Sequence, residues 1–316
     1  MGAAISAKIG VGEKMGRIEE APFWEHKGIR VVFDPEWRCR RQEPLPTKAW
    51  IKTFYEKRYF QEVKDGWDEL QNEEREFWER IFEDKRVNLE ELLPGGSAPW
   101  KCLDVGCGNG MFLAYLQRRG WKVRGIEPSP LARLARDKYG VECSPDFIEN
   151  VPVPSAEDKF HVVHVADLLE HVLEPYELLR KCHAFLRPDG IFLLDHGLDF
   201  NPFQLSAVEQ MGLPCWWIAP EHITYWTHDQ VVGALQREGF EIVRKESDFP
   251  IDLLLLMGID YVSHPERGRE AHRMRENFER VLSKTGRDDV RRRFYRQLAS
   301  VGLGRQIRFY CRPGKT

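Results

Sequence analysis

The sequence lacks any long apolar run. Its block of four leucines at 253–256 is far shorter than the ~20 residues that a membrane-spanning helix needs. The first residues do not follow the pattern of a signal peptide. The opening MGAAIS does fit the loose M-G-x-x-x-[ST] pattern of myristoylation, which is often a chance match. We therefore expect a protein that does not span a membrane.

Paired cysteines are absent as well. The seven cysteines are an odd number, and no two of them form a C-x-x-C pair. This spacing argues against a zinc ribbon and against a disulfide framework. It favours a reducing compartment, so the predicted location is cytoplasmic.

A strong charge of one sign is the third absence. The net charge of −3 gives no overall reason to expect nucleic acid or a membrane surface as partner. The balance is uneven, because the chain from His264 onward has 15 Lys and Arg against 6 Asp and Glu. This basic region could face an anionic partner or could simply be a solvated helical face.

Short apolar strands alternate with helical patterns in the middle of the chain. The strands are expected at 101–105, 122–127, 160–165 and 190–195, and the helices between them at 111–119, 129–138 and 174–186. Such alternation is typical of βαβ units, which build a parallel sheet covered on both faces. The predicted fold class is therefore α/β and Rossmann-like.

The flanking segments are different in character. Residues 1–45 show little periodicity and are expected to be irregular, whereas 48–62 and 66–84 read as amphipathic helices. A capping-box pattern of Thr227 with Gln230 predicts a helix, followed by a strand at 240–245, a mostly helical stretch at 250–301 and a last strand at 306–311. The expected domains are an N-terminal extension and helical cap (1–98), a core (99–249), a helical insertion (250–305) and the last core strand (306–316).

A glycine-rich loop follows the first of these strands. Gly106, Gly108 and Gly110 stand between a strand and a helix, where glycine lets a ligand approach the backbone and the helix start offers free N–H groups. Asp104 precedes the loop, and Glu127 ends the next strand, in place to accept two hydrogen bonds from a ribose diol. A dehydrogenase would need G-x-G-x-x-G, but the third glycine comes one residue too early and position 111 is Met.

With these motifs in order, the chain resembles the class I S-adenosylmethionine-dependent methyltransferases. The resemblance rests on LDVGCGNG, GIEPSP, FHVVHVADLLEHV and LRPDGIFLL, over about 100 residues. The chain is most similar to ubiquinone-biosynthesis O-methyltransferases and to sugar methyltransferases of polysaccharide clusters. The resemblance implies S-adenosylmethionine as the cofactor and a seven-stranded sheet whose last two strands form an antiparallel hairpin.

The resemblance also implies a set of cofactor-binding residues. Gly106 and Gly108 would contact the methionine end, with Gly110 completing the loop and Asp104 supporting it. Glu127 would bind the ribose. The other implied contacts are Asp146 and Phe147 at the adenine, and Ala166 and Asp167 near the methyl group. The chain departs from the family where Phe160-His161 replaces the usual Phe-Asp.

Candidate bases are histidines at the carboxyl ends of the strands. Methyl transfer depends mainly on alignment, and a base is needed only when the nucleophile is a poor one such as an alcohol. His222, His171 and His196 are all expected at the edge of the sheet where ligands bind in parallel sheets. His222 is the preferred candidate because it lies in an aromatic loop, whereas His161 and His164 are expected to be core histidines.

The stretch ADLLEHV allows three interpretations. On a helical turn Asp167, Glu170 and His171 could share one face. They could form a helix start at the cofactor pocket, bind or deprotonate the acceptor, or hold a divalent metal. The ubiquinone-pathway enzymes have a similar E-x-x-E-H pattern, linked there to magnesium, but Asp167 replaces the first Glu here. We predict the first of these roles and no metal.

The 250–301 segment is expected to be a substrate lid. Its arginines, including Arg291, Arg292 and Arg293, favour an acceptor with phosphate or carboxylate, although a homodimer interface or a solvated face would have the same composition. We predict O-methylation of a small polar or anionic metabolite such as a sugar, a nucleotide sugar or a natural-product intermediate. A nucleic-acid partner is not expected. An RNA or protein methyltransferase and a catalytically silent interaction protein remain the alternatives.

Overall fold

A computed structural model describes residues 8–9, 23–59, 65–95 and 99–314 of the chain. The MGAAIS pattern lies outside these residues. None of the helices in the described residues combines the length and the apolar character that a membrane-spanning segment needs.

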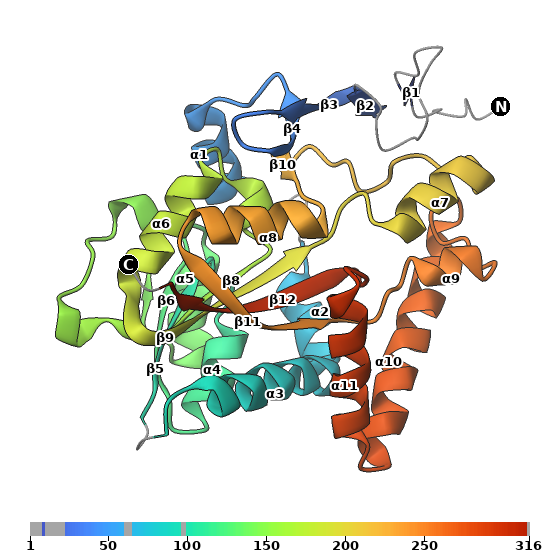
Figure 1. Ribbon diagram of the computed structural model, residues 1–316. Helices are drawn as coiled ribbons and strands as arrows, with labels where there is room; N and C mark the ends of the chain where they lie inside the picture. The colour runs from blue at the N-terminus through green and yellow to red at the C-terminus, as the bar shows by residue number, and fades with distance from the viewer. Residues whose placement is uncertain (1–7, 10–22, 60–64, 96–98, 315–316) are drawn as a thin grey trace.

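A seven-stranded sheet forms the centre of the molecule (Figure 1). Its strand order is β11-β12-β9-β8-β5-β6-β7, with parallel pairing from β9 to β7 and antiparallel pairing of β12 with both neighbours. The strands are β5 (Lys101–Val105), β6 (Lys122–Ile126), β7 (Cys143–Ser144), β8 (Phe160–Ala166), β9 (Leu186–Gly197), β11 (Phe240–Ser247) and β12 (Gln306–Pro313). The predicted Rossmann-like α/β fold and its terminal hairpin are confirmed.

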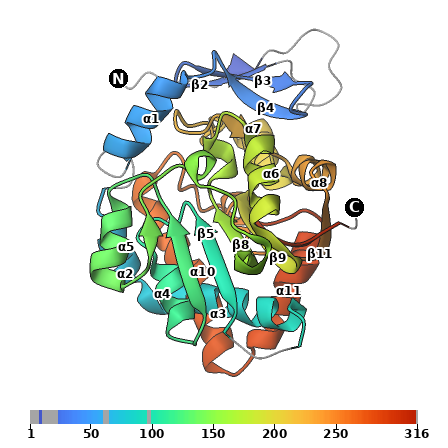
Figure 2. The same cartoon turned by 90° about the vertical axis from the view of Figure 1, so that its left-hand side faces the viewer.

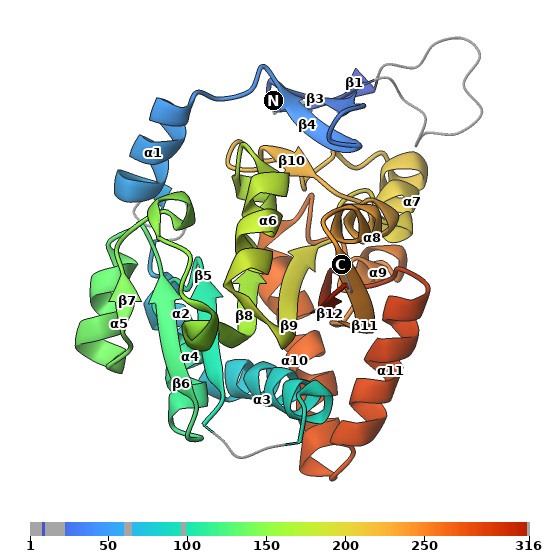
Figure 3. The same ribbon diagram turned by 60° about the vertical axis from the view of Figure 1, so that its left-hand side comes forward.

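Helices cover both faces of this sheet, because its strands present apolar side chains on alternate sides. In β9, Phe192 and Leu194 pack toward one face, whereas Ile191 and Leu193 pack toward the other. The first face is covered by α6 (Pro175–Phe185) and α8 (His228–Arg237), and the second by α3 (Arg75–Leu92), α4 (Met111–Gln117) and α5 (Leu131–Tyr139). Figure 3 shows α6 and α8 in front of the sheet.

A second, smaller sheet corrects the prediction for the N-terminal region. The segment expected to be irregular forms antiparallel strands that pair with a strand about 180 residues away. The sheet contains β1 (Lys8–Ile9), β2 (Phe23–His26), β3 (Ile29–Asp34), β4 (Cys39–Glu43) and β10 (Thr224–Tyr225). Trp24 and Val31 are fully buried against a cluster that includes Phe200 and Trp217. In Figure 2, β2–β4, drawn in blue, lie above the larger sheet.

The predicted helices before the core are present with changed boundaries. The first is α1 (Lys48–Lys57). The expected single helix at 66–84 is two helices, α2 (Trp67–Glu73) and α3, which meet at Glu74. Helix α7 (Pro202–Met211) was not expected, although Asn201 and Gln204 form its capping box. The capping box of Thr227 with Gln230 at α8 is confirmed.

The insertion between β11 and β12 consists of helices. Its three α-helices are α9 (Leu253–Leu256), α10 (Gly268–Lys284) and α11 (Asp288–Ser300). Helices α10 and α11 lie side by side in Figure 1, and α11 packs on β11. This arrangement brings α10 over the carboxyl-end side of the sheet.

Candidate active site

A cavity of about 900 Å³ lies at the carboxyl ends of β5, β8 and β9. The strand ends Gly106, Ala166 and Gly197 contribute to its wall, together with side chains from α2, α3 and α10. Its size is in the range of small-molecule and cofactor sites. It is also on the edge of the sheet where ligands bind in open parallel α/β folds.

The glycine loop forms one wall of this cavity. All three glycines have positive φ angles, +77° at Gly106, +54° at Gly108 and +76° at Gly110. Gly106 and Gly108 line the cavity. Gly110 packs instead behind the loop, where an added Cβ would lie 2.9 Å from the Cβ of Ala135. The first two glycines therefore expose backbone to a ligand, and the third allows the close packing of α4 on α5.

Glu127 connects this loop to β6. Its side chain is buried, with Oε2 accepting the Gly108 N–H at 3.0 Å and Oε1 accepting the Ser129 N–H at 2.9 Å. Burial raises the pKa of this carboxyl group and outweighs the opposing hydrogen bonds. Glu127 is not part of the cavity wall, so its predicted contact with the ribose stays a prediction.

Asp146 and Phe147 follow β7 and do not form part of the cavity wall. The Asp146 carboxylate accepts a hydrogen bond from Asn150 at 3.0 Å, and Phe147 precedes a short 3₁₀ turn. Their predicted contact with adenine stays a prediction. The open glycine loop, the acidic groups beside it and the cavity volume together fit S-adenosylmethionine.

The cavity floor is a row of buried charged side chains on neighbouring strands. Asp104 of β5 pairs with His164 of β8, with 2.7 Å between Oδ1 and Nδ1. Lys85 of α3 lies 3.2 Å from the other nitrogen of His164 and forms an ion pair with Asp195 of β9. Burial lowers the pKa of His164, but Asp104 outweighs this effect and the net shift is upward. His164 is buried as expected, but it also lines the cavity.

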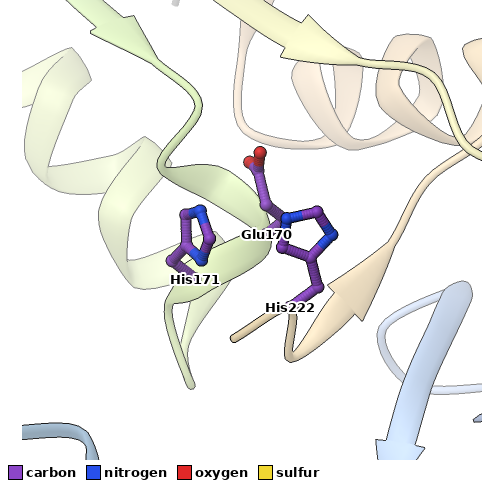
Figure 4. A group of neighbouring side chains, drawn as sticks. All are labelled: Glu170, His171 and His222. Atoms are coloured by element: carbon purple, nitrogen blue, oxygen red, sulfur yellow. The ribbon is translucent and has the colours of Figure 1, made fainter. Parts of the chain in front are cut away.

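The opposite wall carries the acidic and imidazole groups of ADLLEHV. Glu170 and His171 lie in the 3₁₀ turn Leu169–His171 (η5), and His222 comes from the segment before β10 (Figure 4). One donor atom from each residue lies within 4.8 Å of the others. The rings of His171 and His222 are 5.0 Å apart, and His171 Nδ1 donates to the Glu221 carbonyl at 2.8 Å. His171 therefore keeps Nε2 as its free acceptor.

The other two residues of that stretch behave differently. Ala166 and Asp167 line the cavity, as expected for positions near the methyl group. Asp167 has a positive φ of 46°, and its Oδ1 accepts a hydrogen bond from Gln306 at 2.6 Å. The sequence suggested that Asp167 could share one face with Glu170 and His171. In the structure His222, and not Asp167, forms a group with these two residues.

The three candidate histidines occupy unequal positions. His171 and His222 line the cavity, whereas His196 is fully buried behind Glu170. His196 Nδ1 lies 3.1 Å from Glu170 Oε2. Burial lowers the pKa of His196, but Glu170 outweighs it and raises the pKa, so the two groups form an ion pair. Burial and the neighbouring His171 lower the pKa of His222 to about 3, so this imidazole is neutral and weakly basic.

Two groups of donors in the described residues have metal-ligand geometry. One is Glu170, His171 and His222, and the other is Glu74 with His272 and Glu276 where α10 meets the start of α3. Carboxylate and imidazole donors suit divalent metals in general. Glu170, however, already has His196 as an ionic partner.

The arginines of the insertion have two separate roles. Arg291 and Arg292 bind the Asp84 carboxylate, and Arg293 pairs with Asp289, so these three side chains are engaged away from the cavity wall. The expected use of this triplet for an anionic acceptor is therefore wrong. Arg269 and Arg273 of α10 do line the cavity.

The cavity residues that the sequence did not identify as site residues include Lys85, His164, Asp195 and Asp199. A signal for two of them exists in β8 and β9, where His164 and Asp195 interrupt otherwise apolar runs near the carboxyl end of each strand. Lys85 lies on a helix whose register over the sheet the sequence does not specify.

Known proteins share these features. A family model described as "Methyltransferase domain" matches residues 77–245. The chain is 37% identical over 101 residues to the ubiquinone biosynthesis O-methyltransferase of Actinobacillus pleuropneumoniae serotype 5b (strain L20). This match covers 29% of this chain and 43% of that protein. The chain is 30% identical over 156 residues to the enzyme of the same name from Dinoroseobacter shibae, covering 46% and 62%. The chain thus spans about half the length of these relatives.

A solved structure shares the fold. It is a chain of the complex that contains the Haloferax volcanii Trm112 methyltransferase activator, with a TM-score of 0.50 and 16% sequence identity, covering 84% of this chain and 98% of that one. Because the family model covers more than half of the sequence, the chain belongs to the methyltransferase domain family, and this membership indicates S-adenosylmethionine as its cofactor.

Proposed function

We propose that the protein transfers the methyl group of S-adenosylmethionine to an oxygen atom of a small polar acceptor. The observation that carries this proposal is a single cavity with the open glycine loop on one side and Glu170, His171 and His222 on another. A cofactor at the loop and an acceptor at the imidazoles would share one enclosed space. That geometry is what an in-line displacement requires.

The residues of the chain would supply position and environment. The bound cofactor provides a methyl group on a sulfonium, whose positive charge matches the carboxylates of Asp104 and Asp167 along the wall. Gly106 and Gly108 allow the cofactor to lie against the backbone, and Glu127 fixes the loop. Side chains of α3 and α10 line the cavity, and displacement of water by the bound substrates would strengthen each electrostatic interaction inside it.

The acceptor class follows from the lining. Polar and charged residues outnumber apolar ones along the wall, which suits a hydrophilic molecule such as a sugar, a nucleotide sugar or a natural-product intermediate. Arg269 and Arg273 at α10 would favour an acceptor with a phosphate or carboxylate group. In this proposal the insertion acts as a lid in a cytoplasmic enzyme, and a homodimer is compatible with it.

Calorimetric titration with S-adenosylmethionine tests the proposal. We expect saturable binding to the wild type and a loss of at least about 100-fold in affinity in Glu127→Ala, because two hydrogen bonds to a charged group contribute about 3 kcal/mol or more. Incubation with a small-molecule extract should then yield a product heavier by the mass of one CH₂ group.

Two results would contradict the hypothesis that the protein is an enzyme. Absence of saturable heat in the wild type, or equal affinity in Glu127→Ala, would favour a catalytically silent interaction protein. Methylation of RNA or protein in place of the small molecules, with retention of RNA that weakens as salt rises, would instead favour a macromolecular substrate.

A further inference from the structure

Asp199 lies in the cavity wall, two residues after the end of β9. Its side chain is only 4% exposed, and its N–H donates to the Trp226 carbonyl at 3.0 Å. The next residue, Phe200, has a φ of +55°, an unusual value for a bulky side chain. Phe200 is held there by edge contacts with Trp24 and Trp217, at ring distances of 5.0 and 5.3 Å. Strained backbone of this kind persists where surrounding structure fixes it, and it gathers at functional sites.

The other aspartates of the cavity have close partners, as Asp167 does in Gln306 at 2.6 Å. Asp104 is bound by His164, and Asp195 by Lys85. Asp248 accepts two backbone N–H groups through Oδ1 and pairs with Arg275 at 3.1 Å through Oδ2. Each of these carboxylates therefore has a side-chain partner within about 3 Å in the protein itself.

Asp199 has no comparable side-chain partner among the residues that the structure describes. The nearest cation is Arg305, whose Nη1 lies 3.9 Å from Oδ1, beyond hydrogen-bond distance. The other titratable groups that act on it are His196, Glu170 and Tyr225. A carboxylate in a cavity wall without a side-chain donor is available to a ligand.

The basicity of this group also differs from that of His222, the preferred histidine candidate. Burial raises the pKa of Asp199 to about 7, against the opposing effects of Arg305, His196 and the Trp226 backbone. His222, with a pKa of about 3, is a far weaker proton acceptor. A general base is most effective when its pKa is near the working pH, so Asp199 suits proton removal better than His222.

We propose that Asp199 is the general base that takes the proton from the acceptor hydroxyl during methyl transfer. This assignment rests on the proposed function. As the acceptor oxygen forms its bond to the methyl carbon, the carbon–sulfur bond breaks and its electron pair stays on sulfur. The hydroxyl proton moves to an Asp199 oxygen, and the resulting carboxylic acid then releases it to solvent. His171 and His222 line the same cavity and would orient the acceptor.

The experiment uses the full-length protein, S-adenosylmethionine labelled in its methyl group, and a small-molecule extract of the source cells. Initial rates of label transfer are measured from pH 5 to 9 for the wild type, Asp199→Asn, Asp199→Glu and His222→Asn. Asp252→Asn serves as the matched control, because Asp252 is equally buried but is bonded to Asn201 and Tyr261 away from the cavity wall. Affinity for S-adenosylhomocysteine is measured for every variant to confirm folding.

We expect the wild-type rate to rise with pH up to about 7 and then to level off, since the ionised carboxylate is the active form. Asp199→Asn should lower the rate by about 100- to 10,000-fold and remove this inflection, with unchanged affinity for S-adenosylhomocysteine. Asp199→Glu should restore part of the rate, and Asp252→Asn should keep it.

Three results would overturn the assignment. They are a rate in Asp199→Asn within tenfold of the wild type, an unchanged pH profile in that variant, or loss of the pH inflection in His222→Asn while Asp199→Asn retains it. Loss of S-adenosylhomocysteine binding in Asp199→Asn would instead assign the residue to the cofactor and also overturn the proposal. Failure of the wild type to transfer any label would refute the proposed function itself, and the base assignment with it.

Discussion

Two regions of the molecule bury several charged side chains, and they differ in how those charges are satisfied. Between α3 and α11, Asp84 is held by both Arg291 and Arg292, with 2.6 Å between Arg291 Nη1 and Asp84 Oδ2. Arg291 is 2% exposed and also binds Asp288. Across the sheet edge, the cavity holds an aspartate, Asp199, whose nearest cation is 3.9 Å away.

This difference distinguishes buried charges that only stabilise the fold from buried charges that are available to a ligand. Burying ions costs several kcal/mol per group unless hydrogen bonds and opposite charges compensate. In the α3–α11 cluster the compensation comes from arginines of the protein, and none of Asp84, Arg291 and Arg292 lines the cavity. In the cavity wall it is incomplete, and a bound molecule can supply the remainder. Burial of a charged residue is therefore weak evidence of function until its partners have been identified.

The largest effect is expected in the α3–α11 cluster. Arg291→Met keeps the apolar stem but leaves Asp84 without its two-point partner. We expect the free energy of unfolding to fall by about 3–5 kcal/mol, as for other buried pairs that lose one member. Chemical denaturation measures this change.

Arg293→Met is the control for this prediction. Its side chain is 69% exposed and its partner Asp289 is exposed as well, so a change within about 0.5 kcal/mol is expected. Affinity for S-adenosylhomocysteine should be normal in both folded variants. Equal stability of the two variants would show that the buried α3–α11 cluster does not stabilise the fold more than an exposed ion pair does.

An intermediate effect is expected at the mouth of the cavity. Arg269 and Arg273 lie one helical turn apart on α10 and line the cavity, and no described carboxylate forms an ion pair with either. If the acceptor is anionic, Arg269→Gln with Arg273→Gln should raise its KM by about 5- to 30-fold at unchanged kcat, since each partly exposed ion pair contributes about 1 kcal/mol.

Steady-state kinetics on the acceptor identified by mass spectrometry provides the measurement. The effect should shrink at high salt, because exposed charges are screened. Unchanged KM would mean that the acceptor carries no anionic group near α10, and the proposed acceptor would then be a neutral polar molecule.

Much of the core could be predicted from the sequence. The strands around LDVGCGNG and FHVVHVA and the capping box at Thr227 depend on local patterns, whereas the terminal hairpin was implied by the resemblance to methyltransferases; all are present. The small N-terminal sheet could not be predicted, because β4 pairs with β10 across about 180 residues and both are short. Trp24 stands next to Phe23 and Val31 next to Val32, so these strands of four and six residues carry no clear alternation of apolar and polar residues.

The site residues could be predicted where a sequence motif defines their position, but not where tertiary packing defines it. The glycine loop and ADLLEHV were found, yet the alignment of Glu170 with His222 depends on a loop more than 50 residues later. The arginines of the insertion show the same limit. Arg269 and Arg291 are alike in the sequence, and only the positions of α10 and α11 place the first at the cavity and the second at Asp84.

The smallest effect is expected from removing divalent metal. The wall at Glu170, His171 and His222 has the geometry of a metal site, but it already has internal compensation, because His196 Nδ1 lies 3.1 Å from Glu170 Oε2. A positive imidazole at that distance opposes a cation on the same carboxylate. We therefore expect EDTA to change the transfer rate by less than about twofold, and Mg²⁺ or Mn²⁺ to produce no heat of binding. A tenfold loss of rate in EDTA that Mg²⁺ restores would contradict this prediction and would make the wall a true metal site.

His196→Gln provides the sharper comparison, because it removes the imidazole that competes with a cation for Glu170. This variant should bind Mn²⁺ more tightly than the wild type does. Equal affinities would show that His196 does not compensate Glu170.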